Sequence, residues 1–296
     1  MGGNAESATR KLVRFCRAGG SRCALRAPAR WTNFVMLSLI LSPTLAKSAD
    51  NLDVSVSVLF EEIKAKPVEL RHFLQNFPKG GDLHSHLSGA VYAESYLELA
   101  SERDLCVDLK SKVLSKPPCD PIQSPPVRSI LDNKDEFGFE NFNQLINALS
   151  TRHYGLGPVS GRDQFFSTFQ RFFQALDGSR GDMLAEVVSR AGRQKILYLE
   201  LMQSLGMFEV AQEARSNGDL DAPFGSKVDH SMIEAEVAKV VKRLDQIEAR
   251  RDALLGCGSS SAEQSEGCSV EVRYLAQVIR ELSPIEVYAQ ALLAFK

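Results

Sequence analysis

The chain has 296 residues, of which 44% are hydrophobic and 24% are charged, and this balance excludes a disordered or collagen-like protein. The formal net charge is -2, but residues 1–46 contain seven basic residues and a single acid. The remainder of the chain is therefore acidic, which gives no electrostatic reason to expect binding to nucleic acid or to an anionic membrane. A small-molecule substrate is the better expectation.

Residues 1–46 have the pattern of a secretory signal. A basic stretch precedes a short apolar run at residues 34–41, and small residues follow at the position where a signal peptidase cleaves. The run is too short for the roughly 20 apolar residues that span a bilayer. We therefore expect a signal peptide and basic leader in residues 1–46, a secreted or periplasmic protein, and no stable membrane anchor.

Residues 47–77 are predicted to form a helical lead-in, because apolar residues recur at helical spacing and Pro67 interrupts them. The next segment, residues 78–81, breaks the helix. Residues 82–87 are predicted to be a strand that enters a loop at residues 88–90, and a further helix is expected over residues 91–99.

Four cysteines follow the leader as two close pairs, Cys106 with Cys119 and Cys257 with Cys268. Secretion makes disulfides available, and closing each short loop would stabilise the fold by about 3 kcal/mol. Four unpaired thiols are the alternative. A zinc ribbon is disfavoured because neither pair has C-x-x-C spacing.

The middle of the chain contains a turn-rich segment and a helix with many aromatic residues. Residues 115–133 are rich in Pro, Ser and Asp and are predicted to be a surface excursion outside the core. Five phenylalanines then occupy one stripe of a predicted amphipathic helix that runs to Leu176: Phe165, Phe166, Phe169, Phe172 and Phe173. A helix over residues 183–194 and a buried strand over residues 195–202 follow.

The last third repeats this alternation, with a helix over residues 231–255, a strand over residues 270–278 and a helix that Pro284 begins. Strands alternating with helices predict a parallel α/β fold. Glu200 and Glu271 lie in predicted strands. We expect both to be buried beside a positive partner, for which Arg273 is a candidate, and not to act as an acid/base pair.

His84 and His86 are the candidate metal ligands. Side chains alternate across a strand, so both imidazoles point to one side of residues 82–87. Two imidazoles on one face can share a zinc ion, and the carboxyl end of a strand is where parallel α/β enzymes carry their active sites.

The whole segment Pro-Lys-Gly-Gly-Asp-Leu-His-Ser-His-Leu-Ser-Gly-Ala, residues 78–90, closely resembles the first-strand motif of the adenosine deaminase family. The phenylalanine-rich helix with the strand Leu-Tyr-Leu-Glu-Leu, and the strand at 270–278, are similar to the elements that follow in its secreted branch. The resemblance covers about residues 73–296. It implies that residues 78–296 form about three of the eight strand-helix units of a TIM-type β/α barrel.

The resemblance also implies a chemistry. In that family a zinc-activated water attacks the purine ring of adenosine and releases ammonia, which yields inosine. One zinc ion would be held by His84 and His86. A purine nucleoside would be contacted by His86, Ser88, Gly89, Phe165 and Phe169, although Ser88 stands where the family has an aspartate that holds the ribose.

The family completes its site with further histidines, a His-Ala-Gly-Glu-like motif and an aspartate pair, and this sequence contains none of them. We therefore expect an N-terminal portion that is incomplete and inactive alone, with no catalytic acid or base of its own. Two alternatives are a non-enzymatic extracellular nucleoside-binding or degenerate deaminase-like protein, and another amidohydrolase such as an adenine deaminase.

Overall fold

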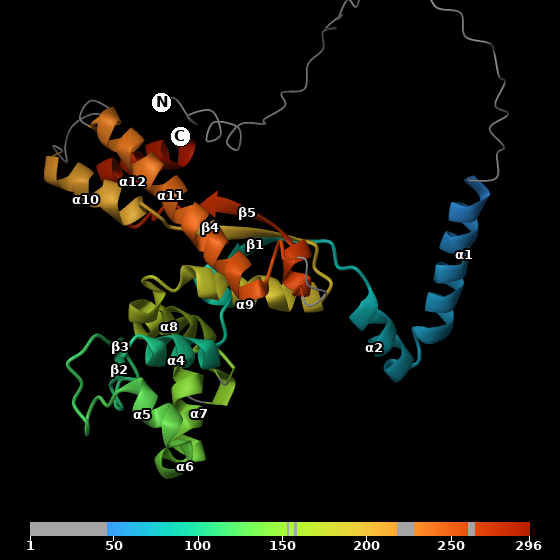
Figure 1. The fold of residues 1–296 in the computed structure, drawn as a ribbon, viewed down its shortest axis with the longest axis horizontal. Helices are drawn as coiled ribbons and strands as arrows, with labels where there is room; N and C mark the ends of the chain where they lie inside the picture. Colours follow the sequence, from blue (N-terminus) through green and yellow to red (C-terminus); the bar gives the residue numbers. More distant parts are fainter. Residues whose placement is uncertain (1–45, 153, 157–158, 218–227, 260–263) are drawn as a thin grey trace, which may run out of the picture. The chain divides into compact units, whose positions relative to one another are not determined.

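The computed structural model describes residues 46–152, 154–156, 159–217, 228–259 and 264–296, with side chains from residue 55 onward. The chain divides into two units, Met1–Leu59 and Phe60–Lys296, and each is described by itself. Their elements are drawn in Figure 1 and run as follows: α1 Ala46–Ile63, α2 Pro67–Asn76, β1 Gly81–His86, α3 Leu87–Ala90, α4 Ala93–Glu102, β2 Cys106–Val107, β3 Leu114–Ser115, α5 Val127–Asp132, α6 Lys134–Phe137, α7 Phe139–Ala148, η2 Tyr154–Leu156, α8 Gly161–Leu176, α9 Arg180–Arg193, β4 Tyr198–Gln203, α10 Met207–Asn217, α11 His230–Leu255, η3 Glu266–Ser269, β5 Glu271–Ala276 and α12 Pro284–Phe295.

The predicted signal peptide lies outside the described residues, apart from its last residue. The helical lead-in is present and breaks where proline requires it, since α1 ends at Ile63 and α2 begins with Pro67 at its first position. Proline fits there because the first helical residue needs no N–H partner. No described helix is both long and apolar enough to cross a membrane.

The three predicted strands form one parallel sheet in the order β1-β4-β5. Within the described residues these strands do not close into a barrel. The pairing of β1 with β4 shifts between Asp82 and Ser85, whereas β4 and β5 pair without a break from Tyr198 to Gln203. The parallel α/β prediction is therefore confirmed at the level of a small sheet with helices.

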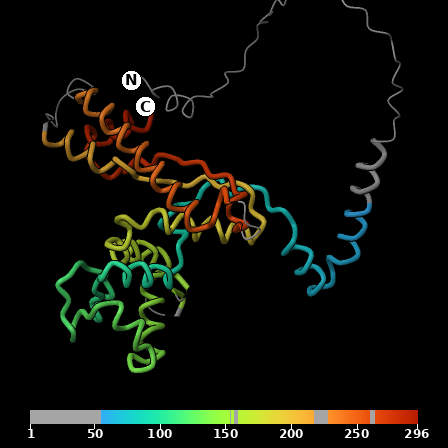
Figure 2. The backbone as a smooth tube through the Cα atoms, in the orientation of Figure 1, coloured from blue at the N-terminus to red at the C-terminus, as the bar shows by residue number. Residues whose placement is uncertain are grey.

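The two faces of this sheet differ. Leu199 and Leu201 of β4 belong to one buried cluster with Leu184 and Val188 of α9, while the alternate residues of β4 are only half buried. The predicted buried strand is therefore buried on one face only: helices cover that face, and Tyr198, Glu200 and Met202 on the other face are half buried. Figure 2 shows α10, α12 and the first part of α11 grouped at the end of the sheet where β4 and β5 finish, and α11 then runs back to α9. The group surrounds a second buried cluster that includes Met207, Ile233, Ile285 and Leu293.

The segment between β1 and α8 is more structured than its composition suggested. Residues 115–133 contain the end of β3 and all of α5. The predicted surface excursion is confirmed for residues 115–126, none of which is buried. It was wrong for residues 127–133, where Val127 and Ile130 belong to the main cluster, because the stretch folds back so that Val127 N–H donates to the Leu105 carbonyl at 2.9 Å.

Both cysteine pairs are disulfides. Cys106 is bonded to Cys119, which fastens this folded-back stretch, and Cys257 is bonded to Cys268 across the loop after α11. The second loop then packs on α9 with almost no space, since a Cβ at Gly192 would lie 2.5 Å from the backbone carbonyl carbon of Glu266. Helix η3, in this loop, is thus held against α9.

Candidate functional site

His84 and His86 lie at the carboxyl-terminal part of β1. Their ring centroids are 5.8 Å apart, and the rings meet at 68°. They are on the same side of the strand, as the alternation predicts. His84 is exposed and His86 is half buried, so the pair lies at the boundary between solvent and the sheet.

The ring of His86 contacts the residue that follows β5, the strand at the opposite edge of the sheet from β1. Its Nδ1 lies 3.1 Å from Oε1 of Gln277, the residue that follows β5. The hydroxyl of Ser204, just beyond β4, donates to the same oxygen at 3.5 Å. All three strands therefore meet at His86, because parallel strands bring their carboxyl ends to one edge.

The chain turns into a short helix directly after His86. Residues 88–90 were expected to be a loop, but they belong to α3, which spans Leu87–Ala90. Tyr96 donates its hydroxyl to the Ser88 carbonyl at 2.6 Å. Burial raises the pKa of the Tyr96 hydroxyl well above its ordinary value, so this group remains a donor at any physiological pH. The backbone of Ser88 is consequently held in place.

Helix α9 holds the other end of this turn. Arg190 donates to the Ala90 carbonyl and to Oε1 of Glu186, and its guanidinium lies 4.2 Å from the ring centroid of Tyr92. The backbone N–H of Tyr92 donates to the same Glu186 oxygen at 3.1 Å. The turn that leaves the histidine strand is thus fixed at both ends by side chains from helices on either side.

A cavity of about 490 Å³ opens beside this turn. Its lining includes four of the residues that the resemblance assigned to substrate, namely Ser88, Gly89, Phe165 and Phe169. The other lining residues come from the segment 90–96 and from α7, α8 and the residues between them: Ala90, Val91, Tyr92, Ala93, Glu94, Tyr96, Ile146, Leu149, Ser150, Thr151, Arg152, Thr168 and Phe172. Pockets for small organic ligands have volumes of about 300–1,000 Å³, mostly apolar walls and a few polar groups. The cavity therefore has the size and lining expected for a small organic ligand.

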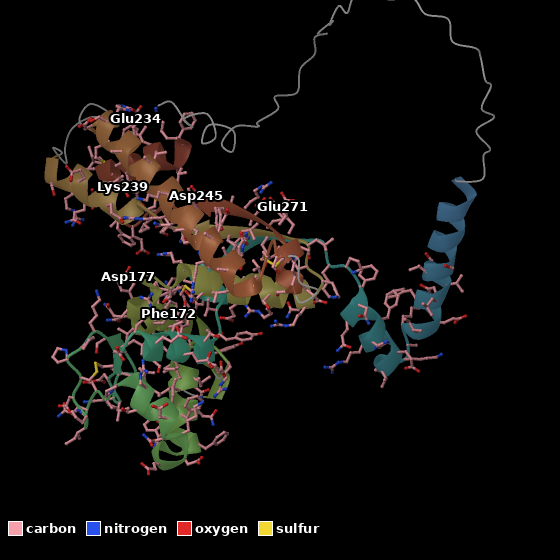
Figure 3. All side chains as sticks on the ribbon, in the orientation of Figure 1. Phe172, Asp177, Glu234, Lys239, Asp245 and Glu271 are labelled. Atoms are coloured by element: carbon pink, nitrogen blue, oxygen red, sulfur yellow. A yellow bond between two sulfur atoms is a disulfide. The ribbon has the colours of Figure 1, made fainter. Side chains whose placement is uncertain are left out.

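The phenylalanine helix is not a uniformly packed stripe. Phe172, labelled in Figure 3, is buried and stacks on Tyr96 with ring centroids 4.5 Å apart. Phe165 and Phe169 meet edge to face at 5.0 Å on the cavity wall, whereas Phe166 and Phe173 are more than half exposed. The stripe thus serves both packing and the cavity.

The open face of the sheet carries polar pairs. Arg273 is ion-paired with Glu271, which Figure 3 labels on β5, and Tyr198 donates its hydroxyl to Oε1 of Glu200 at 2.9 Å. The hydrogen bond to Glu200 is the main cause that raises the pKa of Tyr198. The predicted partner of Glu271 is confirmed, but its burial is not, since its side chain is 54% exposed.

A larger hollow, of about 880 Å³, lies at the opposite end of the strands. Its lining comes from α2 and from the residues just before β1 and β4, including Arg71, Lys79, Arg193 and Lys195. Neither this hollow nor the smaller cavity is lined by a histidine, but the smaller cavity adjoins the turn directly after His86. The amino end of parallel strands, moreover, is not where such folds place their chemistry. We therefore assign the candidate site to the smaller cavity and the histidine pair.

The donor set of the histidine pair suits zinc as a partial site. Imidazole is a ligand for this borderline metal, and structural or catalytic zinc requires three or four protein ligands. Across the residues that the structure describes, no group of three or more His, Cys, Asp or Glu side chains is placed to hold a metal ion. His84 and His86 would supply two positions of such a site.

Comparison with models of known protein families gives no match, and comparison with the curated proteins gives no significant match either. The site is therefore described by its own geometry alone.

Sequence reasoning missed the polar residues that support the site. Gln277 lies two residues beyond Leu275 and four beyond Arg273, so strand alternation would have placed it on the open face with His86. Tyr96, Glu186 and Arg190 gave no such signal, because they sit on helices whose approach to residues 88–92 depends on tertiary packing.

Proposed function

We propose that this chain provides the first strands, two metal ligands and part of the purine pocket of a zinc-dependent nucleoside deaminase, which converts adenosine or a related purine nucleoside to inosine and ammonia. The observation that carries the proposal is that the histidine pair, which does not itself line the cavity, is followed directly in the chain by the turn that does. His84 and His86 share one face of β1, and the turn that follows lines the cavity with Phe165 and Phe169. The parallel order β1-β4-β5, with helices on one face, is also how a β/α barrel would begin.

Each side chain has a role in this proposal. His84 and His86 would hold the ion, which supplies a nucleophile near neutral pH when bound. Phe165 and Phe169 would present apolar ring faces to the purine, and Ser88 would offer an uncharged hydrogen-bonding group to the sugar. The remaining ligands and the carboxylate that transfers protons would come from further strands of the same fold.

We further propose that the protein acts in a secretory or periplasmic compartment. Two disulfides support this location, because such bonds persist in oxidising compartments and are rare in the cytosol.

Zinc titration of the full chain tests the metal site. We expect His84→Ala and His86→Ala each to weaken zinc binding by about tenfold or more, which corresponds to about 1.4 kcal/mol, because each removes one of two imidazoles. His230→Ala is the matched control, since His230 is exposed at the start of α11. Calorimetry measures all four proteins. Unchanged zinc affinity in both strand variants would refute the site.

The reaction is tested separately. The chain is assayed for inosine formation from adenosine, both alone and joined to any residues that its gene encodes after Lys296. Turnover that survives replacement of both His84 and His86 by alanine would show that these residues do not belong to the catalytic site.

A further inference from the structure

We infer that Gln277 is a positioning residue that fixes the tautomer of His86, so that Nδ1 carries the proton and Nε2 keeps its lone pair for a metal ion. The role of this tautomer in metal binding rests on the proposed function, but the tautomer itself is a property of this chain that can be measured without metal. Gln277 lies in the strand segment that the family resemblance covers, but the resemblance assigned it no role, and it is 191 residues from His86 in sequence.

The direction of the hydrogen bond follows from the groups involved. The carbonyl oxygen of Gln277 lies 3.1 Å from His86 Nδ1, and an amide oxygen only accepts. The Ser204 hydroxyl also approaches this oxygen, at 3.5 Å. Because a neutral imidazole has one N–H, a proton held on Nδ1 leaves Nε2 unprotonated.

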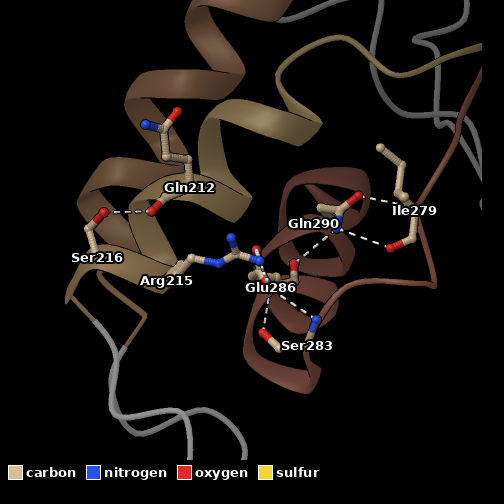
Figure 4. A network of polar contacts seen from close by, with 7 residues as sticks. All are labelled: Gln212, Arg215, Ser216, Ile279, Ser283, Glu286 and Gln290. Atoms are coloured by element: carbon tan, nitrogen blue, oxygen red, sulfur yellow. Dashed lines mark hydrogen bonds and ion pairs between the residues drawn. The ribbon is translucent and has the colours of Figure 1, made fainter. Parts of the chain in front are cut away.

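Gln277 is itself held firmly. Its backbone N–H donates to the Gln203 carbonyl at 2.8 Å, which continues the β4–β5 pairing beyond the end of β5. Two residues later, the buried side chain of Gln290 accepts from the Ile279 N–H at 2.8 Å and donates to the Ile279 carbonyl at 3.4 Å, as Figure 4 shows. The strand end that carries Gln277 is therefore anchored on both sides.

Helix α12, which provides Gln290, is fixed at its start by Glu286. The Glu286 carboxylate accepts from the Ser283 hydroxyl and from the Ser283 backbone N–H, and it is ion-paired with Arg215 of α10 at 2.9 Å (Figure 4). Glu286 is buried. Polar contacts thus join α10 to α12 and α12 to Ile279, which lies two residues after Gln277 in the chain. The Gln277 side chain in turn contacts the His86 ring.

His84 provides an internal comparison. It lies on the same strand face as His86, but its ring is exposed and makes no hydrogen bond to any described residue. The two rings therefore differ in how far their orientation is fixed without metal. A hydrogen bond orients the His86 ring before a metal ion binds, whereas the His84 ring would be oriented by the ion itself. Metal-bound histidines commonly donate their second N–H to an acceptor, and removing that acceptor costs about 10–100-fold in metal affinity.

The test uses the metal-free full chain with ¹⁵N-labelled histidine at a pH about two units above the ordinary histidine pKa of about 6.5. Long-range ¹H–¹⁵N spectra report which ring nitrogen is protonated, and His84→Ala and His86→Ala assign the signals. We expect His86 to be the Nδ1–H form and His84 to be a mixture. Gln277→Leu should shift His86 to a mixture without changing His84, and Gln277→Glu should retain the Nδ1–H form.

Gln212→Leu, at an exposed position on α10, is the matched control and should leave both rings unchanged. The inference is overturned if His86 carries its proton on Nε2 in the native chain, or if a folded Gln277→Leu variant keeps the native tautomer. If Gln277→Leu fails to fold, a shift of His86 in Gln277→Glu away from the native form overturns it instead.

Zinc titration of the same proteins separates this inference from the proposed function. We expect Gln277→Leu to raise the dissociation constant by about 10–100-fold. Native protein that shows the Nδ1–H form but binds no zinc would refute the deaminase proposal and leave the role of Gln277 in fixing the tautomer intact.

Discussion

At the scale of single residues, the site depends on side chains that hold backbone in place. Tyr96 and Arg190 each donate to a carbonyl of the turn after β1, so the cavity wall at Ser88 and Ala90 is supported from two helices. Neither residue needs to touch a ligand to matter. A polar group that fixes a carbonyl also fixes the side chain on the same residue.

Phe169 is the aromatic residue whose removal should affect ligand binding most directly. Stacking of a base on an aromatic ring contributes about 1–3 kcal/mol, so Phe169→Ala should weaken binding of a purine nucleoside by about tenfold to a hundredfold. Equilibrium dialysis with labelled adenosine measures this.

Phe173→Ala is the control on the same helix, because Phe173 is 56% exposed and does not line the cavity. Equal losses in the two variants would mean that α8 contributes only through its fold.

At the scale of elements, α9 and η3 pack backbone to backbone with almost no space between them. A methyl group at Gly192 would meet the Glu266 carbonyl carbon at 2.5 Å and the Gly267 nitrogen at 2.7 Å. Both neighbours are backbone, so neither can move aside as a flexible side chain would. The glycine is therefore required by the distance between helix and loop.

Gly192→Ala should destabilise the fold by about 1–3 kcal/mol, since overpacking outweighs the better helix propensity of alanine. Gly155→Ala is the control, because a Cβ there meets nothing within 4 Å, and it should change stability by less than about 0.5 kcal/mol. Urea denaturation measures both. If Gly192→Ala unfolds at the same urea concentration as the native protein, η3 can move away from α9 without a loss of stability.

The start of α12 should make stability depend on pH. The Ser283 hydroxyl is the first of several donors that lower the pKa of Glu286. A lowered folded-state pKa stabilises the fold above the unfolded pKa, and the contribution is lost as pH falls through the folded value. Ser283→Ala should therefore cost about 1 kcal/mol at neutral pH, and the cost should shrink in acid.

Ser283→Thr keeps the hydroxyl and should retain most of the stability at both pH values. Denaturation at neutral and acidic pH provides the comparison. A loss from Ser283→Ala that is the same at every pH would show that the hydroxyl acts through the helix cap and not through the Glu286 carboxylate.

At the scale of the whole molecule, both disulfides close short loops, because the bonded cysteines are separated by 13 and 11 positions in the sequence. Neither joins β1 to β4 or β5. They therefore stabilise local segments, and the sheet that carries the histidines depends on packing and strand pairing alone.

Replacement of Cys106 and Cys119 by serine should lower the free energy of unfolding by about 3 kcal/mol while leaving zinc affinity within about twofold of native. Hydrogen exchange should show lost protection around β2 and β3 and retained protection in β4. Loss of zinc binding in this variant would mean that the disulfide-bonded segment helps to shape the metal site.

The elements that the sequence predicted well are those with a strong local pattern. The sequence predicted seven elements within a few residues of their bounds: β1, β4, β5, α8, α9, α11 and α12. Each of these segments has apolar residues at the spacing typical of a strand or a helix. The parallel arrangement of the strands was predicted from the alternation of strands and helices along the chain.

The parts that the sequence did not predict depend on distant contacts. Residues 115–133 look like a solvent-exposed loop, and only the return of Val127 to Leu105 makes the end of this segment part of the core. The histidine pair was predicted from alternation, but the bond from His86 to Gln277 requires β5 to lie beside β4 and β4 beside β1. Strand order of that kind is a property of the packed chain.

The same sheet order has a kinetic consequence. β1 is made early in synthesis, yet its partner β4 begins more than a hundred residues later, after the whole disulfide-bonded segment. Pairing over such a separation is slow, because loop closure precedes any gain from contact. The nascent chain therefore carries its histidine strand unpaired while α4 to α8 are being made. The time needed to synthesise the chain as far as β4 sets how long the edge of that strand remains exposed to other chains.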